Sequence, residues 1–236
     1  MTHPARSEDC KLTRIPLAAL LSLALLVPTV HAQQAPAARV PVVQNEIGKH
    51  AALSVSDVQI LFADLQPGLV STSTTVEPKT LAASAGALAK AAHILGIPMT
   101  FAIVPQAGKP GQLIPELRPY ASKTNTINRV IASPFSEPAL VSALAENRRK
   151  VLVIVGFATE VAVLQGALDG IAAGYTVQVP VDGIGSRSER TEQAAIRQIE
   201  RAGGVTTSVL SLVAKLAPDF SRAPGSETLK AVISLH

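Results

Sequence analysis

Side chains that can do chemistry stand directly after apolar runs in this 236-residue sequence. Asp64 follows the run Val58–Ala63, the turn Gly156–Glu160 follows Val151–Val155, and Asp182 follows a further apolar run. A carboxylate can act as a general base, and the first turn of a helix offers free N–H groups to an anion. A site made from these residues requires the ends of several strands to meet at one edge of a sheet.

The same side chains also have structural interpretations, which the residues alone leave open. Asp64 is equally suited to cap a helix or to accept hydrogen bonds in a loop. Arg129 alone is more typical of a surface ion pair. Thr159 is typical of a helix N-cap, and Glu160 suits the positive end of a helix dipole. Asp182 is explained equally well as the cap of the next loop.

Strand and helix patterns alternate along the chain from about residue 57. The strands are apolar on both faces, which indicates a parallel sheet covered by helices on both sides. We therefore predict a three-layer α/β/α, Rossmann-like fold, with its site beyond the carboxyl ends of the strands near a switch in strand order. The predicted strands are 58–63, 99–104, 151–155, 175–181 and 205–208, and the predicted helices are 79–95, 137–146, 159–173 and 189–202.

The residue inventory argues against metal, cofactor and nucleic-acid chemistry. Cys10 is the single cysteine, and the histidines after residue 32 have no ligand spacing, so we expect no bound metal. The segment Gly183–Ser186 is too short for a dinucleotide fingerprint, and we expect no cofactor. The net charge is +4, but only 3% of the residues are aromatic and the basic cluster Arg148–Lys150 is short. We therefore expect no nucleic-acid partner.

The N-terminus has the layout of a secretory signal peptide. Lys11 and Arg14 precede an apolar run over residues 15–27, and small or apolar residues precede Gln33. We expect cleavage after Ala32, a periplasmic or secreted location, and no membrane contact after cleavage. The apolar run is shorter than the roughly 20 residues of a membrane span, although an uncleaved anchor is the alternative. This divides the chain into a signal peptide (1–32), a leader or arm (33–52) and one domain (53–236).

Two motifs resemble the signatures of the isochorismatase-like cysteine hydrolases. The segment 61–66, with Asp64 followed by Gln66, is similar to the first-strand motif of that family. The segment 156–163 is similar to the second signature, in which Thr-Glu-Val precedes a cysteine. The segments 111–117 and 217–220 resemble the YcaC-type subgroup, whose members assemble into ring-shaped oligomers. The resemblance implies the α/β fold predicted above, a hydrolase ancestry and a homo-oligomer.

Within this resemblance, Ala162 stands where the family has its nucleophilic cysteine. Asp64 corresponds to the general base, and Arg129 corresponds to the basic residue, with Lys123 as the fallback. Ala158, Thr159 and Gln66 correspond to residues that line the binding site; in the family, backbone amides next to a cis peptide stabilise the oxyanion. Alanine offers no nucleophile, and losing a covalent nucleophile costs several orders of magnitude in rate.

Three functions remain open from the sequence. The first is a homologue that binds a small carbonyl or amide compound without cysteine-dependent turnover. The second is a hydrolase in which Asp64 activates water; a weaker variant of it uses the hydroxyl of Thr159 or Ser133 as the nucleophile. The third alternative is a scaffold or partner-binding protein. We also expect a homo-oligomer from composition, because 47% of the residues are hydrophobic and only 16% are charged.

Overall fold

A parallel seven-stranded sheet forms the middle layer of the part of the chain that the computed structural model describes, residues 53–233. Its main path runs β3-β2-β1-β4-β5-β7, and the short β6 pairs with β4. Every strand pairing is parallel. The strands are β1 (Val58–Ala63), β2 (Met99–Ile103), β3 (Thr126–Asn128), β4 (Val151–Phe157), β5 (Thr176–Pro180), β6 (Ile184–Gly185) and β7 (Val205–Thr207).

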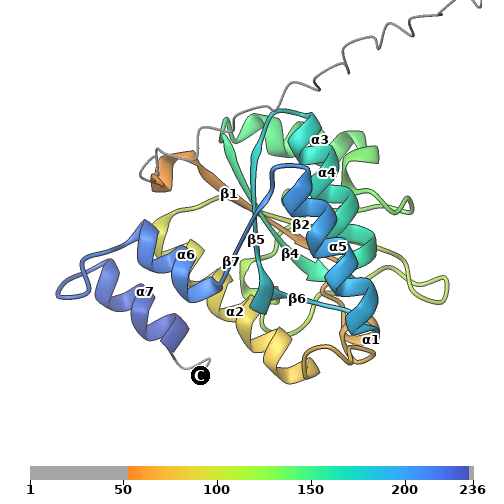
Figure 1. Cartoon of the computed structure of the whole chain (residues 1–236), viewed down its shortest axis with the longest axis horizontal. Helices are drawn as coiled ribbons and strands as arrows, with labels where there is room; N and C mark the ends of the chain where they lie inside the picture. Colours follow the sequence, from red (N-terminus) through yellow and green to blue (C-terminus); the bar gives the residue numbers. More distant parts are fainter. Residues whose placement is uncertain (1–52, 234–236) are drawn as a thin grey trace, which may run out of the picture. The chain divides into compact units, whose positions relative to one another are not determined.

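Helices cover both faces of this sheet, which confirms the predicted three-layer α/β/α fold. One face packs against α2 (Pro78–Leu95) and α6 (Val209–Leu216) (Figure 1), and α7 (Gly225–Val232) packs against these two helices. The other face packs against α3 (Pro138–Glu146), α4 (Leu164–Ala172) and α5 (Glu189–Arg201). A short helix, α1 (Pro67–Val70), follows β1.

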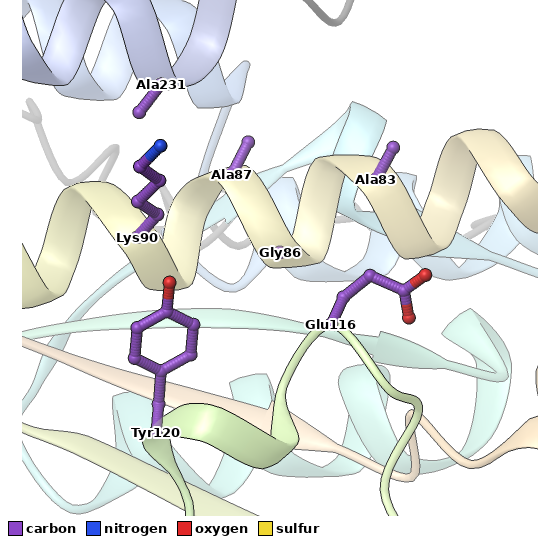
Figure 2. A pocket seen from close by; sticks show the side chains of 7 residues that line it. All are labelled: Ala83, Gly86, Ala87, Lys90, Glu116, Tyr120 and Ala231. Carbon is purple, nitrogen blue, oxygen red and sulfur yellow. The ribbon is translucent and has the colours of Figure 1, made fainter.

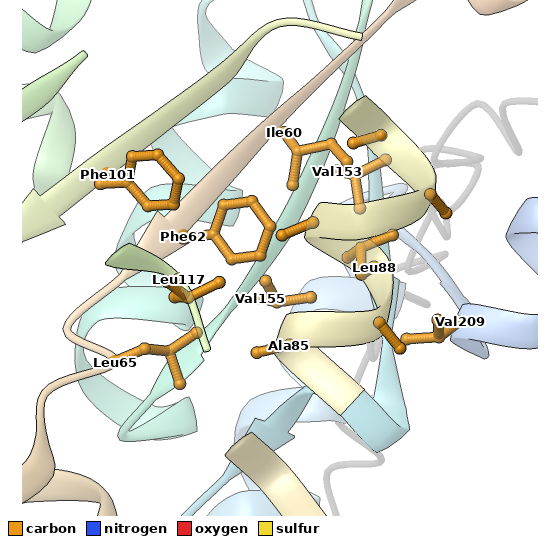
Figure 3. Packing of buried hydrophobic residues seen from close by; sticks show 14 of the residues in the cluster. Ile60, Phe62, Leu65, Ala85, Leu88, Phe101, Leu117, Val153, Val155 and Val209 are labelled. Carbon is orange, nitrogen blue, oxygen red and sulfur yellow. The ribbon is translucent and has the colours of Figure 1, made fainter. Parts of the chain in front are cut away.

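Alternating side chains of the strands supply two separate cores. Ile60 and Phe62 of β1 point to the α2 side, where Phe62 stacks on Phe101 with ring centroids 5.1 Å apart (Figure 3). Leu61 points to the opposite side and packs with the α3–α5 layer. Because both faces are buried, all six residues of β1 are buried and five of them are apolar. The exception, Gln59, accepts a hydrogen bond from the Asn147 side-chain amide at 2.8 Å.

The ends of α2 show how the sequence sets the helix boundaries. The Glu77 side chain accepts a hydrogen bond from the Thr80 N–H at 3.1 Å, and Pro78 occupies the first helical position. Gly96 ends the helix in the left-handed conformation with φ 65°, which glycine adopts without steric cost. These contacts confirm the predicted helix and its glycine cap.

The strand order reverses between β1 and β4, the two central strands. The chain adds β2 and β3 on one side of β1, and then adds β5 and β7 on the other side of β4. Gly156 of β4 lies opposite Ala63 of β1, and a Cβ at Gly156 would stand only 2.3 Å from the Ala63 carbonyl oxygen. The glycine therefore allows the ends of the two central strands to approach closely at the switch point, where such sheets bind ligands.

Several elements differ from the sequence prediction. The predicted helix 159–173 begins with a π-helical segment, Thr159–Val163, before α4. The strands β3 and β6 and the helices α1, α6 and α7 were not predicted. The predicted signal peptide and leader lie outside the described residues. Within residues 53–233, no helix is long and apolar enough to cross a membrane.

Candidate active site

Asp64 and Arg129 form a buried ion pair at the carboxyl ends of β1 and β3. Asp64 Oδ2 lies 2.5 Å from Arg129 Nη2. The backbone N–H groups of both residues donate to β2, Asp64 to the Ala102 carbonyl at 2.9 Å and Arg129 to the Ile103 carbonyl at 3.0 Å. Asp64 has a positive φ of 57°, a conformation that aspartate tolerates better than most residues. The sheet thus brings together two residues that are far apart in sequence.

Burial dominates the electrostatics of this pair. Asp64 is 6% exposed and Arg129 is 3% exposed. Burial raises the pKa of Asp64 from 3.8 to about 6, although the Coulomb attraction and hydrogen bond of Arg129 act in the opposite direction. Among the described residues, Asp64 Oδ1 and Arg129 Nε have no hydrogen-bond partner. The carboxylate therefore ionises near pH 6, which suits a general base at neutral pH.

Arg129 also shapes the loop that follows it. Its Nη1 atom donates hydrogen bonds to the carbonyls of Ile131 and Ala132, the second at 3.0 Å. With the two carbonyls turned toward the guanidinium, the side chains of Val130 and Ile131 are 83% and 56% exposed. The ion pair is thus continuous with an apolar loop at the surface.

A cavity of about 390 Å³ opens beside the ion pair. Both members of the pair line it, together with residues of the β4 end, the loop after Arg129 and the turn after β1. Its volume is in the range of small-molecule sites, and its lining is mostly apolar with a few charged groups. The lining residues are Asp64, Leu69, Val104, Arg129, Val130, Ala132, Phe157, Ala158, Val161 and Arg187.

The turn after β4 supplies one wall of the cavity. The Phe157–Ala158 peptide bond is cis, and Phe157, Ala158 and Val161 all line the cavity. Ala162, which the resemblance aligns with the nucleophile, lies one residue further along, in the π-helical segment. Its methyl group is fully buried and does not line the cavity. In this arrangement Ala162 offers the cavity no reactive atom.

Thr159 does not cap the helix as its sequence position suggests. The N-cap is Ala158, and the Thr159 hydroxyl instead lies 3.0 Å from the Gly185 carbonyl and 2.9 Å from Glu192 Oε1. Glu160 accepts hydrogen bonds from the hydroxyls of Ser186 and Thr191. These contacts fix the turn after β4 to the segment around β6 and α5.

Gln66 links two strand ends. Its side-chain amide donates to the Val104 carbonyl and accepts from the Val104 N–H, both at 2.8 Å. The residue is fully buried, and Val104, not Gln66, lines the cavity. Gln66 therefore positions the end of β2 beside the cavity.

Three further residues considered in the sequence lie elsewhere. Lys123 is exposed and lines other surface hollows, so Arg129 is the basic residue that meets Asp64. Asp182 accepts the Val209 N–H at 2.8 Å and so binds the first residue of α6, whose N-cap is Ser208. The Ser133 hydroxyl donates to Asp169 and does not line the cavity.

A separate hollow of about 330 Å³ lies on the outer side of α2 and shares no lining residue with the first cavity. The Lys90 side chain of α2 points toward Ala231 of α7, and Tyr120 and Glu116 approach α2 from the opposite side (Figure 2). The small residues Ala83, Gly86 and Ala87 of α2 also line it. In the part of the chain that the structure describes, no three His, Cys, Asp or Glu side chains lie close enough to hold a metal ion.

Comparison with known protein families gives the class of protein. The family model of the isochorismatase domain matches residues 58–210, and the chain belongs to this family. The chain is 28% identical over 174 residues to the probable hydrolase YcaC of Escherichia coli, which covers 71% of this chain and 81% of that protein. It is 27% identical over 189 residues to the secreted isochorismatase effector Isc1 of Phytophthora sojae, with 78% and 84% covered.

Solved structures agree with this assignment. YcaC of Escherichia coli, described as an octameric hydrolase of unknown specificity, superposes with a TM-score of 0.73 at 25% identity, covering 80% of this chain and 94% of that one. YcaC of Pseudomonas aeruginosa, solved with hexane-2,5-diol and covalent acrylamide, has the same fold, with a TM-score of 0.73 at 24% identity, covering 80% and 95%. The MAR1 ribonuclease of Caenorhabditis elegans has a TM-score of 0.69 at 26% identity, covering 78% and 93%.

Sequence reasoning missed one charged residue of the cavity, Arg187, and its apolar walls. Arg187 follows β6, a strand of only two residues that has no sequence pattern of its own. Val130 and Val161 belong to a loop and a helix turn whose exposed faces the sequence does not reveal. Only the basic character of Arg187 was visible in advance, and nothing in the sequence connected it with Asp64.

Proposed function

We propose that this protein is an isochorismatase-family hydrolase homologue that binds a small carbonyl or amide compound beside Asp64 and Arg129, without cysteine-dependent hydrolysis. The buried ion pair that lines a cavity of about 390 Å³, at the switch point of the sheet, is the observation that carries this proposal. A carboxylate and a guanidinium can orient a carbonyl group by hydrogen bonding, even where no covalent step follows.

Ala162 is the reason for proposing impaired catalysis. The order of the motif around Thr159 and Glu160 supports its alignment with the nucleophilic cysteine. With the signal peptide removed, the chain has no cysteine that could substitute. A thiol at this position would stand in the first turns of a helix, where free N–H groups favour the thiolate.

The test compares the unmodified protein with Ala162→Cys on a panel of small amides and esters. We expect the unmodified protein to bind panel members without measurable turnover, and Ala162→Cys serves as the comparison with a thiol at this position. Hydrolysis by the unmodified protein that disappears in Asp64→Ala would contradict the proposal. RNA belongs in the panel as well, because a structural neighbour is described as a ribonuclease.

A second candidate function follows from the ionisation of Asp64. A carboxylate with a pKa of about 6 that lines a cavity is suited to remove a proton from water. General-base catalysis of this kind contributes about 10²–10⁴-fold, enough for slow hydrolysis of a reactive ester. The hydroxyl variant has less support, because the Ser133 hydroxyl is bound to Asp169 and the Thr159 hydroxyl to Gly185 and Glu192.

An electrophilic probe with mass spectrometry separates these mechanisms. Turnover that depends on Asp64 without a covalent adduct indicates activated water. An adduct on Ser133 or Thr159 indicates a hydroxyl nucleophile. The scaffold alternative has the least support, since Asp64, Arg129 and the turn after β4 line one cavity.

We also propose that the protein is exported and that its mature chain begins at Gln33. The basic and apolar segments before Ala32 support export, and one relative is described as secreted. An intact mass equal to residues 33–236 from a native fraction is the expected result. A mass of the full chain from the same fraction contradicts cleavage.

A further inference from the structure

The charged groups that line the cavity do not cancel. Asp64 and Arg129 neutralise each other through their ion pair. Arg187 is the third charged lining residue, and within residues 53–233 no carboxylate lies within ion-pair distance of it. With Asp64 ionised, the lining therefore carries one uncompensated positive charge.

Local contacts hold the Arg187 side chain over the cavity. Its Nε donates to the Thr72 hydroxyl at 2.9 Å, and its guanidinium carbon lies 6.0 Å from the centre of the Phe157 ring. The Thr72 hydroxyl in turn donates to the carbonyl of Leu69 at 2.7 Å, and Leu69 also lines the cavity. These contacts engage Nε, while both Nη groups have no protein partner among the described residues.

The backbone before Arg187 is fixed as well. The Ser186 N–H donates to the Thr75 hydroxyl, and the Ser186 carbonyl accepts from the Thr74 N–H, both at 2.8 Å. The Ser186 hydroxyl donates to Glu160, which belongs to the turn that forms the cavity wall. A side chain anchored at its backbone and at Nε loses little conformational entropy when it binds an anion.

The remaining walls of the cavity are apolar. Leu69, Val104, Val130, Phe157 and Val161 contribute hydrocarbon surface. A fully ionic or strongly hydrated ligand would have to desolvate against this surface without compensation. The lining fits a molecule that has an apolar body and a charged group at one end.

We propose that Arg187 is the specificity-determining residue of this cavity and binds the carboxylate of a small ligand whose apolar body contacts Val130, Phe157 and Val161. This inference rests on the proposed function, because it assigns the ligand class of the same cavity. The planar guanidinium matches a carboxylate through two parallel hydrogen bonds. A single uncompensated cation balances the single charge of a carboxylate better than the double charge of a phosphate monoester.

The experiment measures dissociation constants of matched ligands by calorimetry or ligand-observed NMR on the purified full chain. The probes are benzoate with benzamide, hexanoate with hexanamide, and phenyl phosphate. Arg187 is exposed, so its charge is partly screened by water, and we expect each carboxylate to bind about 3- to 10-fold more tightly than its amide. Arg187→Gln should remove this preference by weakening carboxylate binding to about the level of the matched amide, and a urea unfolding transition like that of the wild type shows that the variant is folded.

Two further variants make the result specific. Arg197→Gln removes the same charge from an exposed position on α5 away from the cavity lining, and it should keep the preference. Val161→Trp fills the mouth of the cavity from a residue that is 43% exposed, and it should abolish binding of every probe.

Three other outcomes would each contradict a different part of the argument. Equal binding of carboxylate and amide that Val161→Trp blocks overturns the role of Arg187 and leaves the proposed function standing. Tighter binding of phenyl phosphate than benzoate overturns the assignment of a carboxylate. Absence of binding for every probe overturns the proposed function together with the inference.

Discussion

The raised pKa of Asp64 makes a quantitative prediction for Asp64→Asn. In the wild-type protein the folded-state pKa is about 6, and the ordinary value is 3.8. Between these pH values the Asp64 carboxyl holds a proton in the folded state that it has lost in the unfolded state. The contribution of this proton to the free energy of unfolding is therefore fully present below pH 3.8 and is lost as the pH rises through about 6. At 1.36 kcal/mol per pKa unit, this interval corresponds to about 3 kcal/mol.

The asparagine variant lacks this titration. Arg129 then loses its charge partner, but the guanidinium stays protonated throughout, so the penalty of leaving it unpaired does not change with pH. The free energy of unfolding of the wild type minus that of Asp64→Asn should therefore fall by about 3 kcal/mol from about pH 3.5 to about pH 7. The pH-dependent part isolates Asp64 from every other consequence of the substitution.

Urea denaturation of both proteins across this pH range measures the difference, and carbon NMR of the Asp64 carboxyl measures the pKa directly. A difference that does not change with pH would mean that burial and Arg129 have equal and opposite effects on the pKa of Asp64. A difference that rises with pH would mean that Arg129 outweighs burial, and either result refutes the electrostatic reasoning.

Three further predictions concern packing and assembly. Gly156→Ala should destabilise the fold by about 1–3 kcal/mol in urea denaturation, because the added Cβ would lie 2.3 Å from the Ala63 carbonyl oxygen. The control is Gly166→Ala, whose Cβ would have its nearest neighbour at 3.5 Å, and it should be neutral or stabilising. Gln66→Leu should cost about 2–4 kcal/mol by the same assay, since it leaves the N–H and carbonyl of Val104 without partners. Light scattering on the mature protein should give a multiple of the chain mass at micromolar concentration; a single-chain mass refutes the homo-oligomer.

The central strands could be predicted because each of them consists of consecutive, mostly apolar residues. The runs 58–63 and 151–155 are apolar on both faces, and the structure buries each of them. Asp64 could be expected at a strand end on the same ground. These features depend on local sequence, and local sequence is sufficient to find them.

The other parts depend on contacts between distant residues. The three residues of β3 become a strand only because β2 offers a paired edge, and Arg129 reaches Asp64 through that pairing. The start of α6 depends on Asp182, which lies 27 positions away in sequence from Val209. A local hydrophobic pattern does not show which distant residues pair, so these parts of the fold and site could be found only in the structure.

The two arginines of the cavity have different roles because only one of them has a charge partner. When Asp64 takes up a proton below about pH 6, the positive charge of Arg129 is no longer balanced, and the lining gains a second cation beside Arg187. A bound carboxylate should therefore be held more tightly at about pH 5 than at about pH 7.5, as long as the ligand itself stays ionised. Dissociation constants of benzoate at both values measure this, and Asp64→Asn, which keeps Arg129 unbalanced at every pH, should remove the difference. A pH effect that persists in Asp64→Asn would show that another group controls the charge of the cavity.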